Sequence, residues 1–498
     1  MRFERAAGIL LHPTSLPGAY GVGDLGPAAY EWVDWLAATG CKLWQVLPLG
    51  PTGYGDSPYQ CFSAMAGNPY MISPQLLLDA GLLTRSDLAP MPEWNPQRVD
   101  YGLLYEWKPA LLEKAYRRFA GKTPPGLGSE FEQFCAESAG WLGDYALFMA
   151  IKEVHGGGGW DQWPAPLRRR EPAALSQIQR DLAERISYAS FVQFAFFSQW
   201  NALRIYAGEH GIQIIGDLPL FVAYDSADVW ADPDLFFLDD SGRPTVVAGV
   251  PPDYFSPTGQ LWGNPLYRWE AHKSSGYAWW LDRIRQALKM SDIVRLDHFR
   301  GLAGYWEIPG DASTAEHGRW VTGPGADFLQ AVASGLGAGG EDLPIIAEDL
   351  GVITPDVVAL REQFHLPGMK ILQFAFSGPD NPFLPHHYPR NCVVYTGTHD
   401  NDTSRGWYAH ASQAEKDFAL RYLNVDGSDF AWDLIRAAWA SAAAFALAPM
   451  QDLLDLGAEA RMNYPSRLGG NWEWRMAERA LEGPLQKRLG DLVWLYGR

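Results

Sequence analysis

Cysteine is scarce in this chain, which has four in a total of 498 residues. They are Cys41, Cys61, Cys135 and Cys392. No two of them form a C-x-x-C pair, so neither a zinc site nor a disulfide framework is predicted. The H-E-x-x-H motif is absent, His386 and His387 lie beside prolines in a predicted loop, and no run of alternating acids around a glycine forms an obvious calcium loop. We therefore expect no metal, no other cofactor, and activity that survives chelation.

Long hydrophobic runs are also missing. The apolar run near the start, residues 6–11, is too short for a signal peptide. The Ala-rich stretch at residues 437–450 is too short to cross a membrane and predicts a buried helix. These features are typical of a cytoplasmic protein, in which the glycosylation sequon at residues 401–403 is a chance match.

Basic charge is in short supply. The chain has 40 Lys and Arg against 58 Asp and Glu, a formal net charge of −18. A basic patch is the usual footprint of nucleic-acid or anionic-membrane binding, so neither partner is expected. The sequence leaves the oligomeric state open between a monomer and a small homo-oligomer.

Aromatic residues, by contrast, are plentiful, with 22 Trp and 22 Tyr. Many stand beside Gly, Pro and Asp in loop-like contexts, at residues 53–60, 158–164 and 251–265. Aromatic faces in loops are suited to stacking on sugar rings, although the same residues also fill cores and loop bases. Composition alone does not separate these two interpretations.

Short apolar runs that end in polar, Gly or Pro residues recur along the chain. We predict strands in the runs that begin at Ala6, Leu43, Ile212, Ile293, Leu343, Gly368 and Cys392, with a weaker eighth at Ala444. Helix-like patterns separate most of them, which indicates a parallel sheet covered on both faces. Eight such units predict an α/β fold, a (β/α)8 TIM barrel.

The spacing of these strands is uneven, and a plain barrel takes roughly 250 residues. We therefore expect one catalytic barrel over residues 1–498 with large insertions. A mostly helical insertion is predicted at about residues 60–205, between strands 2 and 3. Another is predicted at about 222–290, between strands 3 and 4, and carries a lid loop at 249–265.

Charged residues stand at the ends of several predicted strands, where the chemistry of such barrels lies. They are Asp217, Arg295, Asp297, Glu348, Asp349, His399 and Asp400. Arg295 and Asp297 point the same way, because side chains two apart on a strand share a face. A purely structural explanation would need a matching set of buried cations, and only Arg295 is evident. Crowded carboxylates raise one another's pKa at a cost in stability, so a functional site is the better interpretation.

Several acids and abundant loop aromatics favour glycosidic chemistry. That reaction needs one carboxylic acid to protonate the leaving oxygen and one carboxylate to attack or to activate water. Glu348 and Asp349 are adjacent and face opposite ways on a strand, so only one of them is expected to lead the chemistry.

At this point the sequence resembles a known family, the amylomaltases, which are the 4-α-glucanotransferases of the α-amylase clan. The resemblance runs over nearly the whole length and is specific when its motifs are taken together. The motifs are SLPGAYGVGDLG (15–26), LPLGPTGYGDSPYQ (47–60), IGDLPLFV (215–222), GVPPDYFSPTGQLWGNP (249–265), RLDHFRG (295–301), IIAEDLG (345–351), TGTHDNDT (396–403) and RMNYP (461–465).

The resemblance implies transfer of α-1,4-glucan segments to the 4-hydroxyl of an acceptor glucan or glucose, by a retaining double displacement through a covalent glycosyl-enzyme. Maltooligosaccharides, amylose, starch or glycogen would be the substrates. It implies Asp297 as the nucleophile, Glu348 as the acid/base and Asp400 as the third carboxylate, which holds the distorted donor sugar. The implied substrate-binding residues are Tyr59, Asp217, Arg295, His298, His399 and Asn463, and for His298 an indirect role is an equal alternative.

Three other functions are compatible with parts of the sequence. GVGDLG at residues 21–26 matches a dinucleotide fingerprint, but prolines separate it from the preceding strand and the next strand ends without an acid for a ribose. A non-catalytic glycan-binding protein would not need three carboxylates at strand ends. An α-amylase-like retaining glucan hydrolase is the serious alternative, because it shares the three carboxylates.

The stretch at 249–265 is the predicted source of the difference between transfer and hydrolysis. Transfer succeeds only if water is excluded and the acceptor is held in place. Prolines stiffen this stretch. Tyr254, Phe255 and Trp262 offer apolar faces for acceptor sugars, and Asp253 and Gln260 offer side chains that hydrogen-bond sugar hydroxyls. A well-packed surface loop with no role in acceptor choice is the alternative.

Overall fold

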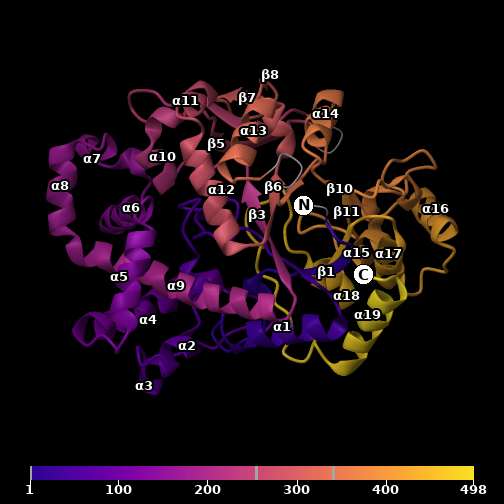
Figure 1. Cartoon of the computed structure of the whole chain (residues 1–498), viewed down its shortest axis with the longest axis horizontal. Helices are drawn as coiled ribbons and strands as arrows, with labels where there is room; N and C mark the ends of the chain where they lie inside the picture. Colours follow the sequence, from indigo (N-terminus) through magenta and orange to yellow (C-terminus); the bar gives the residue numbers. More distant parts are fainter. Residues whose placement is uncertain (1–2, 253–255, 339–342) are drawn as a thin grey trace.

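The computed structural model describes residues 3–252, 256–338 and 343–498. Eight parallel strands close into a barrel (Figure 1). In order around the ring they are β1 (Ala6–Leu10), β12 (Phe445–Pro449), β11 (Cys392–Tyr395), β10 (Gly368–Ile371), β9 (Ile345–Ala347), β6 (Ile293–Asp297), β3 (Gln213–Pro219) and β2 (Leu43–Gln45). The predicted (β/α)8 fold is confirmed, including its weakest strand at 444.

The side chains of β6 alternate between the inside and the outside of the barrel. Ile293 packs with residues from the other barrel strands in one interior cluster. Val294 and Leu296 belong to a different cluster, which lies outside the barrel. By the same alternation, Arg295 and Asp297 share the inward face with Ile293. The charged end of this strand therefore faces the barrel mouth and not the surrounding helices.

Helices surround the barrel on its outer face. Those that follow the strands most directly are α1 (Pro27–Thr39), α9 (Ala183–Glu209), α12 (Ala278–Met290), α13 (Gly325–Gly335), α14 (Pro355–Gln363), α17 (Phe430–Ala440) and α19 (Gly483–Leu495). Shorter ones near the barrel are α10 (Ala227–Ala231), α11 (Trp269–Ser274), α15 (Ser404–His410), α16 (Gln413–Leu423) and α18 (Met450–Leu453). Between β10 and β11, residues 372–391 form only short 3-10 turns, so no α-helix directly follows β10.

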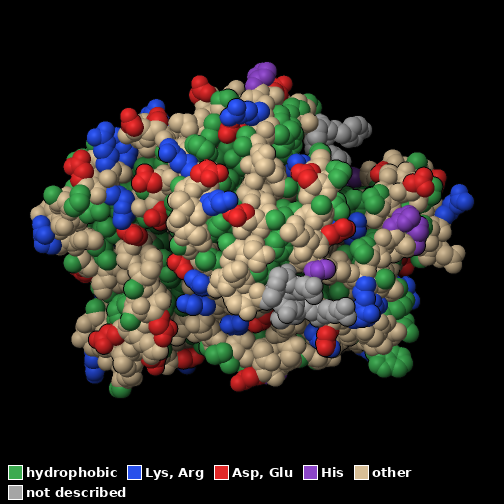
Figure 2. Space-filling model, turned by 45° about the horizontal axis from the view of Figure 1, so that its top comes forward, with side chains coloured by type: hydrophobic (Ala, Val, Ile, Leu, Met, Phe, Trp, Pro, Cys, Tyr) green, Lys and Arg blue, Asp and Glu red, His purple; other side chains and the backbone are tan. Residues whose placement is uncertain are grey.

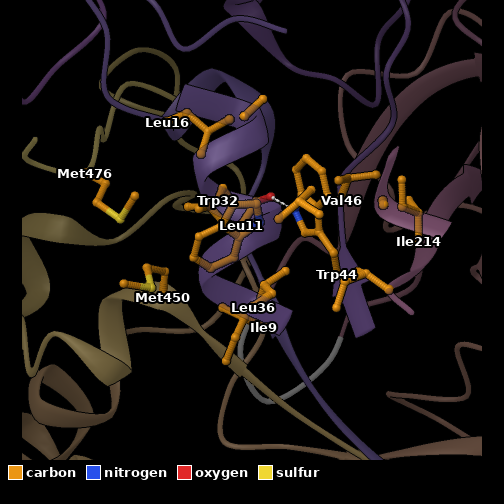
Figure 3. Packing of buried hydrophobic residues seen from close by; sticks show 14 of the residues in the cluster. Ile9, Leu11, Leu16, Trp32, Leu36, Trp44, Val46, Ile214, Met450 and Met476 are labelled. Carbon is orange, nitrogen blue, oxygen red and sulfur yellow. Dashed lines mark hydrogen bonds between the residues drawn. The ribbon is translucent and has the colours of Figure 1, made fainter. Parts of the chain in front are cut away.

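Helix α1 illustrates how sequence sets these elements. Pro27 stands at its first position, where a missing N–H costs nothing, and Gly40 ends it in the left-handed conformation at φ 78°. Trp32 and Leu36 lie on its buried face and pack toward the barrel (Figure 3). The indole Nε1–H of Trp44, on β2, donates to the Leu11 carbonyl oxygen at 2.7 Å, which leaves this large ring both buried and satisfied.

The chain between β2 and β3 is helical and extends to one side of the barrel (Figure 1). Besides α9 it contains α2 (Pro74–Asp79), α3 (Arg85–Leu88), α4 (Tyr101–Gly121), α5 (Leu127–Glu137), α6 (Leu142–Val154), α7 (Ala165–Arg168) and α8 (Pro172–Asp181). A ring cluster of Phe119, Phe131, Phe191 and Phe194 joins α4, α5 and α9. These rings belong to the same apolar cluster as Trp32 and Trp44, so the extension shares a continuous core with the barrel.

A second sheet, which the strand pattern did not predict, lies beside the barrel. Its antiparallel order is β5 (Gln260–Pro265), β4 (Val246–Val250), β7 (Gly304–Pro309) and β8 (Arg319–Thr322). The stretch 249–265, expected as a loop, is therefore largely a hairpin whose two ends are paired strands. The Pro and Gly residues of this stretch argue against strands in the sequence. The structure pairs the strands nevertheless, with Gly263 at φ 77° and a register shift between Val247 and Gly249.

The barrel closes where β1 meets β12, with Ala6 opposite Phe445 and Leu10 opposite Pro449. The buried guanidinium of Arg498 donates to the carbonyl oxygens of Ala6 and Ala444 at 3.2 and 3.3 Å. Two segments from opposite ends of the sequence are thereby fastened together.

None of the helices in the described residues is long and apolar enough to cross a membrane. On the face shown in Figure 2, acidic and basic side chains are interspersed, without a continuous basic stripe.

Candidate active site

Charged side chains converge at the carboxyl ends of neighbouring barrel strands. Asp217 lies on β3, Arg295 and Asp297 lie on β6, and Glu348 directly follows β9. The register places Asp217 opposite Arg295, so strand pairing itself brings these groups together. Asp400 enters from the loop after β11.

Arg295 holds two carboxylates at once. One of its terminal nitrogens donates to both oxygens of Asp217 at 2.8 and 2.7 Å, and the other donates to Oδ1 of Asp297 at 2.8 Å. Asp217 is fully buried, and such a charge is tolerable only when it is paired. The guanidinium is planar, so the two ion pairs fix the direction in which Asp297 points.

Glu348 is held by backbone amides. Its Oε2 accepts from the N–H of His298 at 2.7 Å and its Oε1 accepts from the N–H of Leu350 at 2.9 Å. Burial, and secondly the negative charge of Asp297, raise the pKa of Glu348 from the ordinary 4.5 to about 8. The site thus contains one carboxyl group that is protonated at neutral pH beside a carboxylate that is paired with arginine.

The adjacent residue, Asp349, faces away from this cluster. It forms an ion pair with Arg361 and accepts a hydrogen bond from the N–H of Met369 at 2.7 Å. The alternation of strand residues therefore separates Glu348, which faces Asp297, from Asp349, which fastens β9 to β10 and α14.

Asp400 is oriented by an amide and a histidine. The Asn463 side-chain N–H donates to Oδ1 of Asp400 at 2.7 Å, and His399 Nε2 lies 3.3 Å from the same oxygen. The Arg461 guanidinium donates to the Asp400 carbonyl oxygen at 2.6 Å and to that of Asn463 at 2.7 Å. The carboxyl of Asp400 is half exposed, so it remains accessible from solvent.

Tyr59 links the two halves of the cluster. Its hydroxyl donates to Oδ2 of Asp217 at 2.7 Å, and its ring stacks on that of His399 with centroids 5.1 Å apart and planes 15° apart. The centroid of the Trp472 ring lies 6.0 Å from that of Tyr59 and 5.9 Å from that of His399. Together these rings form an aromatic border beside the charged cluster.

His298 connects the cluster to the second sheet. Its backbone is left-handed, at φ 55°, which aims its N–H at Glu348. Its ring meets Trp262 edge to face at 4.8 Å, and the Trp262 Nε1–H donates to the Gln260 side-chain oxygen at 3.1 Å. Burial lowers the pKa of His298 to about 4, so this ring is neutral.

The expected set of site residues is largely brought together by the structure. Tyr254 and Phe255 lie outside the described residues, and so does Asp253 between them and β4. Among the residues that are described, no three His, Cys, Asp or Glu side chains are placed to hold a metal ion.

Two contributors were missed by sequence reasoning. Arg461 stands in the RMNYP motif, two residues before Asn463, and the motif was the only available signal for it. Trp472 carries no such signal, because its contact with Tyr59 joins segments far apart in the chain.

The geometry supports a defined type of chemistry. A carboxyl group with a raised pKa is able to protonate a leaving oxygen, and an arginine-paired carboxylate is able to act as a nucleophile. Neutral hydrogen-bonding groups and aromatic rings around them suit a sugar. If Asp297 and Glu348 were only part of a structural ion-pair network, a raised pKa on Glu348 would serve no purpose.

The chain is similar to known proteins over nearly its whole length. A family model described as 4-alpha-glucanotransferase matches residues 11–481. The chain is 54% identical to a 4-alpha-glucanotransferase of Thermus thermophilus, over 96% of this chain and 95% of that protein. It is 49% identical to one from Synechocystis, over 99% of this chain and 98% of the relative.

A solved structure is also similar to this chain over nearly its full length. An amylomaltase from Streptococcus agalactiae in complex with acarbose superposes with a TM-score of 0.96, at 41% identity, over 99% of this chain and 100% of that one. The chain belongs to the 4-alpha-glucanotransferase family.

Proposed function

We propose that this enzyme transfers segments of α-1,4-glucan to the 4-hydroxyl of an acceptor glucan or glucose with retention of configuration. Maltooligosaccharides, amylose, starch and glycogen are the substrates of this proposal. The observation that carries it is the protonated Glu348 next to the arginine-paired Asp297. This is the pair of protonation states that a retaining glycosidic reaction needs before its first step.

In the first step, Asp297 attacks the anomeric carbon and Glu348 gives its proton to the oxygen of the leaving glucan. A covalent glycosyl-enzyme forms, and Glu348 becomes a carboxylate. In the second step, that carboxylate takes the proton from the 4-hydroxyl of the acceptor, whose oxygen attacks the anomeric carbon and releases Asp297. Two backbone N–H groups stabilise the charged form of Glu348 between the steps.

Asp400 and His399 bind hydroxyls of the donor sugar at the reacting position. The half exposure of Asp400 and its hydrogen bond from Asn463 support this role, since one oxygen is oriented while the group stays accessible. Tyr59 offers its ring to the same sugar, held by the hydroxyl bond to Asp217.

Acceptor binding falls to the hairpin that contains β4 and β5. Trp262 touches His298, which directly follows the proposed nucleophile, so the hairpin borders the reacting centre. We assign Gln260, Trp262, Tyr254 and Phe255 to acceptor sugars, and propose that they exclude water from the glycosyl-enzyme.

Incubation with maltotriose, followed by sizing of the products, tests the proposal. A ladder of longer oligosaccharides together with glucose is expected. Products that are only shorter than maltotriose would identify a hydrolase, the alternative that uses the same carboxylates. The α-configuration of new linkages, read by NMR, tests retention separately.

A further inference from the structure

A second cavity lies outside the site described above. It has a volume of about 340 Å³ and lies between the segment that follows α10 and the start of α12. Trp279, Asp232, Asp234, Leu235 and Ser275 line it. The volume is at the lower end of the range for small-molecule pockets, which suits one or two sugar rings.

Trp279 presents a partly open ring to this cavity. Its neighbours Phe236, Tyr267, His272 and Trp280 meet it at interplanar angles between 49° and 89°, so among the described residues no ring stacks flat upon it. The buried Arg283 lies over the ring at 5.5 Å from its centroid. The indole is thus braced by its surroundings and remains half-buried.

The same arginine ties this pocket to the active site. The Arg283 guanidinium donates to the carbonyl oxygens of Pro219 at 2.5 Å and Leu220 at 3.1 Å. Pro219 ends β3 and pairs with Asp297 in the barrel register. Arg283 therefore links the Trp279 ring to the end of β3, the strand that pairs with β6 beside Asp297.

Two carboxylates border the ring. Asp232 and Asp234 are exposed, and within the described residues neither forms an ion pair with a Lys, Arg or His side chain. Their charge disfavours an anionic ligand. A metal ion is disfavoured too, since the described residues contain no group of three possible ligands. A neutral molecule with neighbouring hydroxyls and an apolar C–H face matches both the acids and the indole.

We propose that this cavity is a second glucan-binding site, which takes one or two glucose units of a polymeric substrate while the reacting segment occupies the barrel. The inference rests on the proposed function for the identity of the sugar. Trp279 stacks on a sugar face, and Asp232 and Asp234 accept hydrogen bonds from hydroxyls. Such a site adds affinity for glucans long enough to reach the barrel at the same time, and it adds nothing to the turnover of maltotriose.

Native gel electrophoresis through soluble amylose, compared with a gel without it, tests this site in the full chain. Trp279→Ala is expected to weaken retardation by amylose about threefold to tenfold, the worth of one aromatic stacking contact. Trp494→Ala is the matched control, because Trp494 is 83% exposed on α19, away from the cavity, and this change is expected to have no effect. Maltotriose disproportionation is expected to stay within about twofold of wild type in both variants.

Asp234→Ala keeps the experiment decisive if Trp279→Ala does not fold. Asp234 is exposed in a short turn, so its removal spares the aromatic packing, and weaker retardation is again expected. Unchanged retardation in folded Trp279→Ala and Asp234→Ala would overturn the inference. Loss of the maltotriose ladder in the wild-type chain would instead overturn the proposed function, so the two failures are distinguishable.

An acidic aromatic pocket also suits an organic cation. Tetramethylammonium is the probe for this alternative, with the Trp279 indole N–H followed by NMR against Trp279→Ala for assignment. A shift with maltotriose supports the glucan site. A shift with tetramethylammonium and none with maltotriose would overturn it.

Discussion

Two regions of the active site, here called the floor and the wall, are held in place differently. The floor, defined as Asp217, Arg295, Asp297 and Glu348, stands on paired barrel strands and is held by short ion pairs and backbone hydrogen bonds. The wall, defined as the β4–β5 hairpin and the segment 461–472, stands on longer connections. The floor is fixed by the register of the barrel strands, whereas the wall combines paired strands of the second sheet with side-chain contacts such as that between Asn463 and Asp400.

The largest expected effect follows the loss of the proposed nucleophile, Asp297, from the floor. Asp297→Asn removes a negative charge and little volume, so fold and glucan binding are expected to persist. Turnover of maltotriose should fall by about four orders of magnitude or more, because the covalent step is lost. Activity within about tenfold of wild type would remove Asp297 from this role.

The next effect tests whether the buried ion pairs hold the floor together. Arg295→Met leaves Asp217 buried without its cation, and we expect a loss of about 3–5 kcal/mol in the free energy of unfolding. Urea denaturation measures it. Arg98→Met breaks the exposed pair with Glu473 near the wall and is expected to cost about 0–1 kcal/mol. Equal losses in the two variants would contradict the difference between floor and wall.

A third effect is the pH dependence of the free energy of unfolding that the protonation of Glu348 causes. The pKa of Glu348 in the folded chain is about 8 against an ordinary 4.5, so the folded state holds a proton that the unfolded state has lost between these values. The resulting stability is present below pH 4.5 and is lost as pH rises through 8. Glu348→Gln does not titrate, so we expect its free energy of unfolding to exceed that of wild type by up to about 4 kcal/mol at pH 8 and to lie within about 1 kcal/mol of it at pH 4.5.

The same pKa sets an activity limit. The first step needs Glu348 protonated, so transfer by the wild-type enzyme should decline above pH 8. A rate that is flat up to pH 10, or a stability difference that does not depend on pH, would contradict the assignment.

The smallest expected effect belongs to the wall. Trp262→Ala removes the indole that meets His298 and should admit water to the glycosyl-enzyme. We expect the ratio of hydrolysis to transfer, measured as glucose released against oligosaccharide extended, to rise about threefold or more, with total turnover less affected. Tyr206→Phe, which loses only a surface hydrogen bond to Asp34, is the control. An unchanged ratio would remove the hairpin from acceptor choice.

Sequence predicted the floor well and the wall poorly, for physical reasons. The two-residue period of a strand places Arg295 and Asp297 on one face and separates Glu348 from Asp349 without any knowledge of the fold. The pairing of β4 with β5 was obscured by prolines and by the irregular register at Gly249. The contacts of Arg461 and Trp472 join distant segments, and no local pattern encodes them.

The junction of β1 with β12 also governs how this molecule is made. During synthesis the first barrel strand emerges early, but its partner at Phe445–Pro449 appears only after nearly the whole chain has left the ribosome. At roughly 5–20 residues per second, the edge of β1 stays unpaired for a time on the order of a minute. An open edge is a template for pairing with another chain. We expect chains that stop before Phe445 to elute as oligomers on size-exclusion chromatography. A monomeric peak would show that the incomplete barrel covers the unpaired edge of β1 by itself.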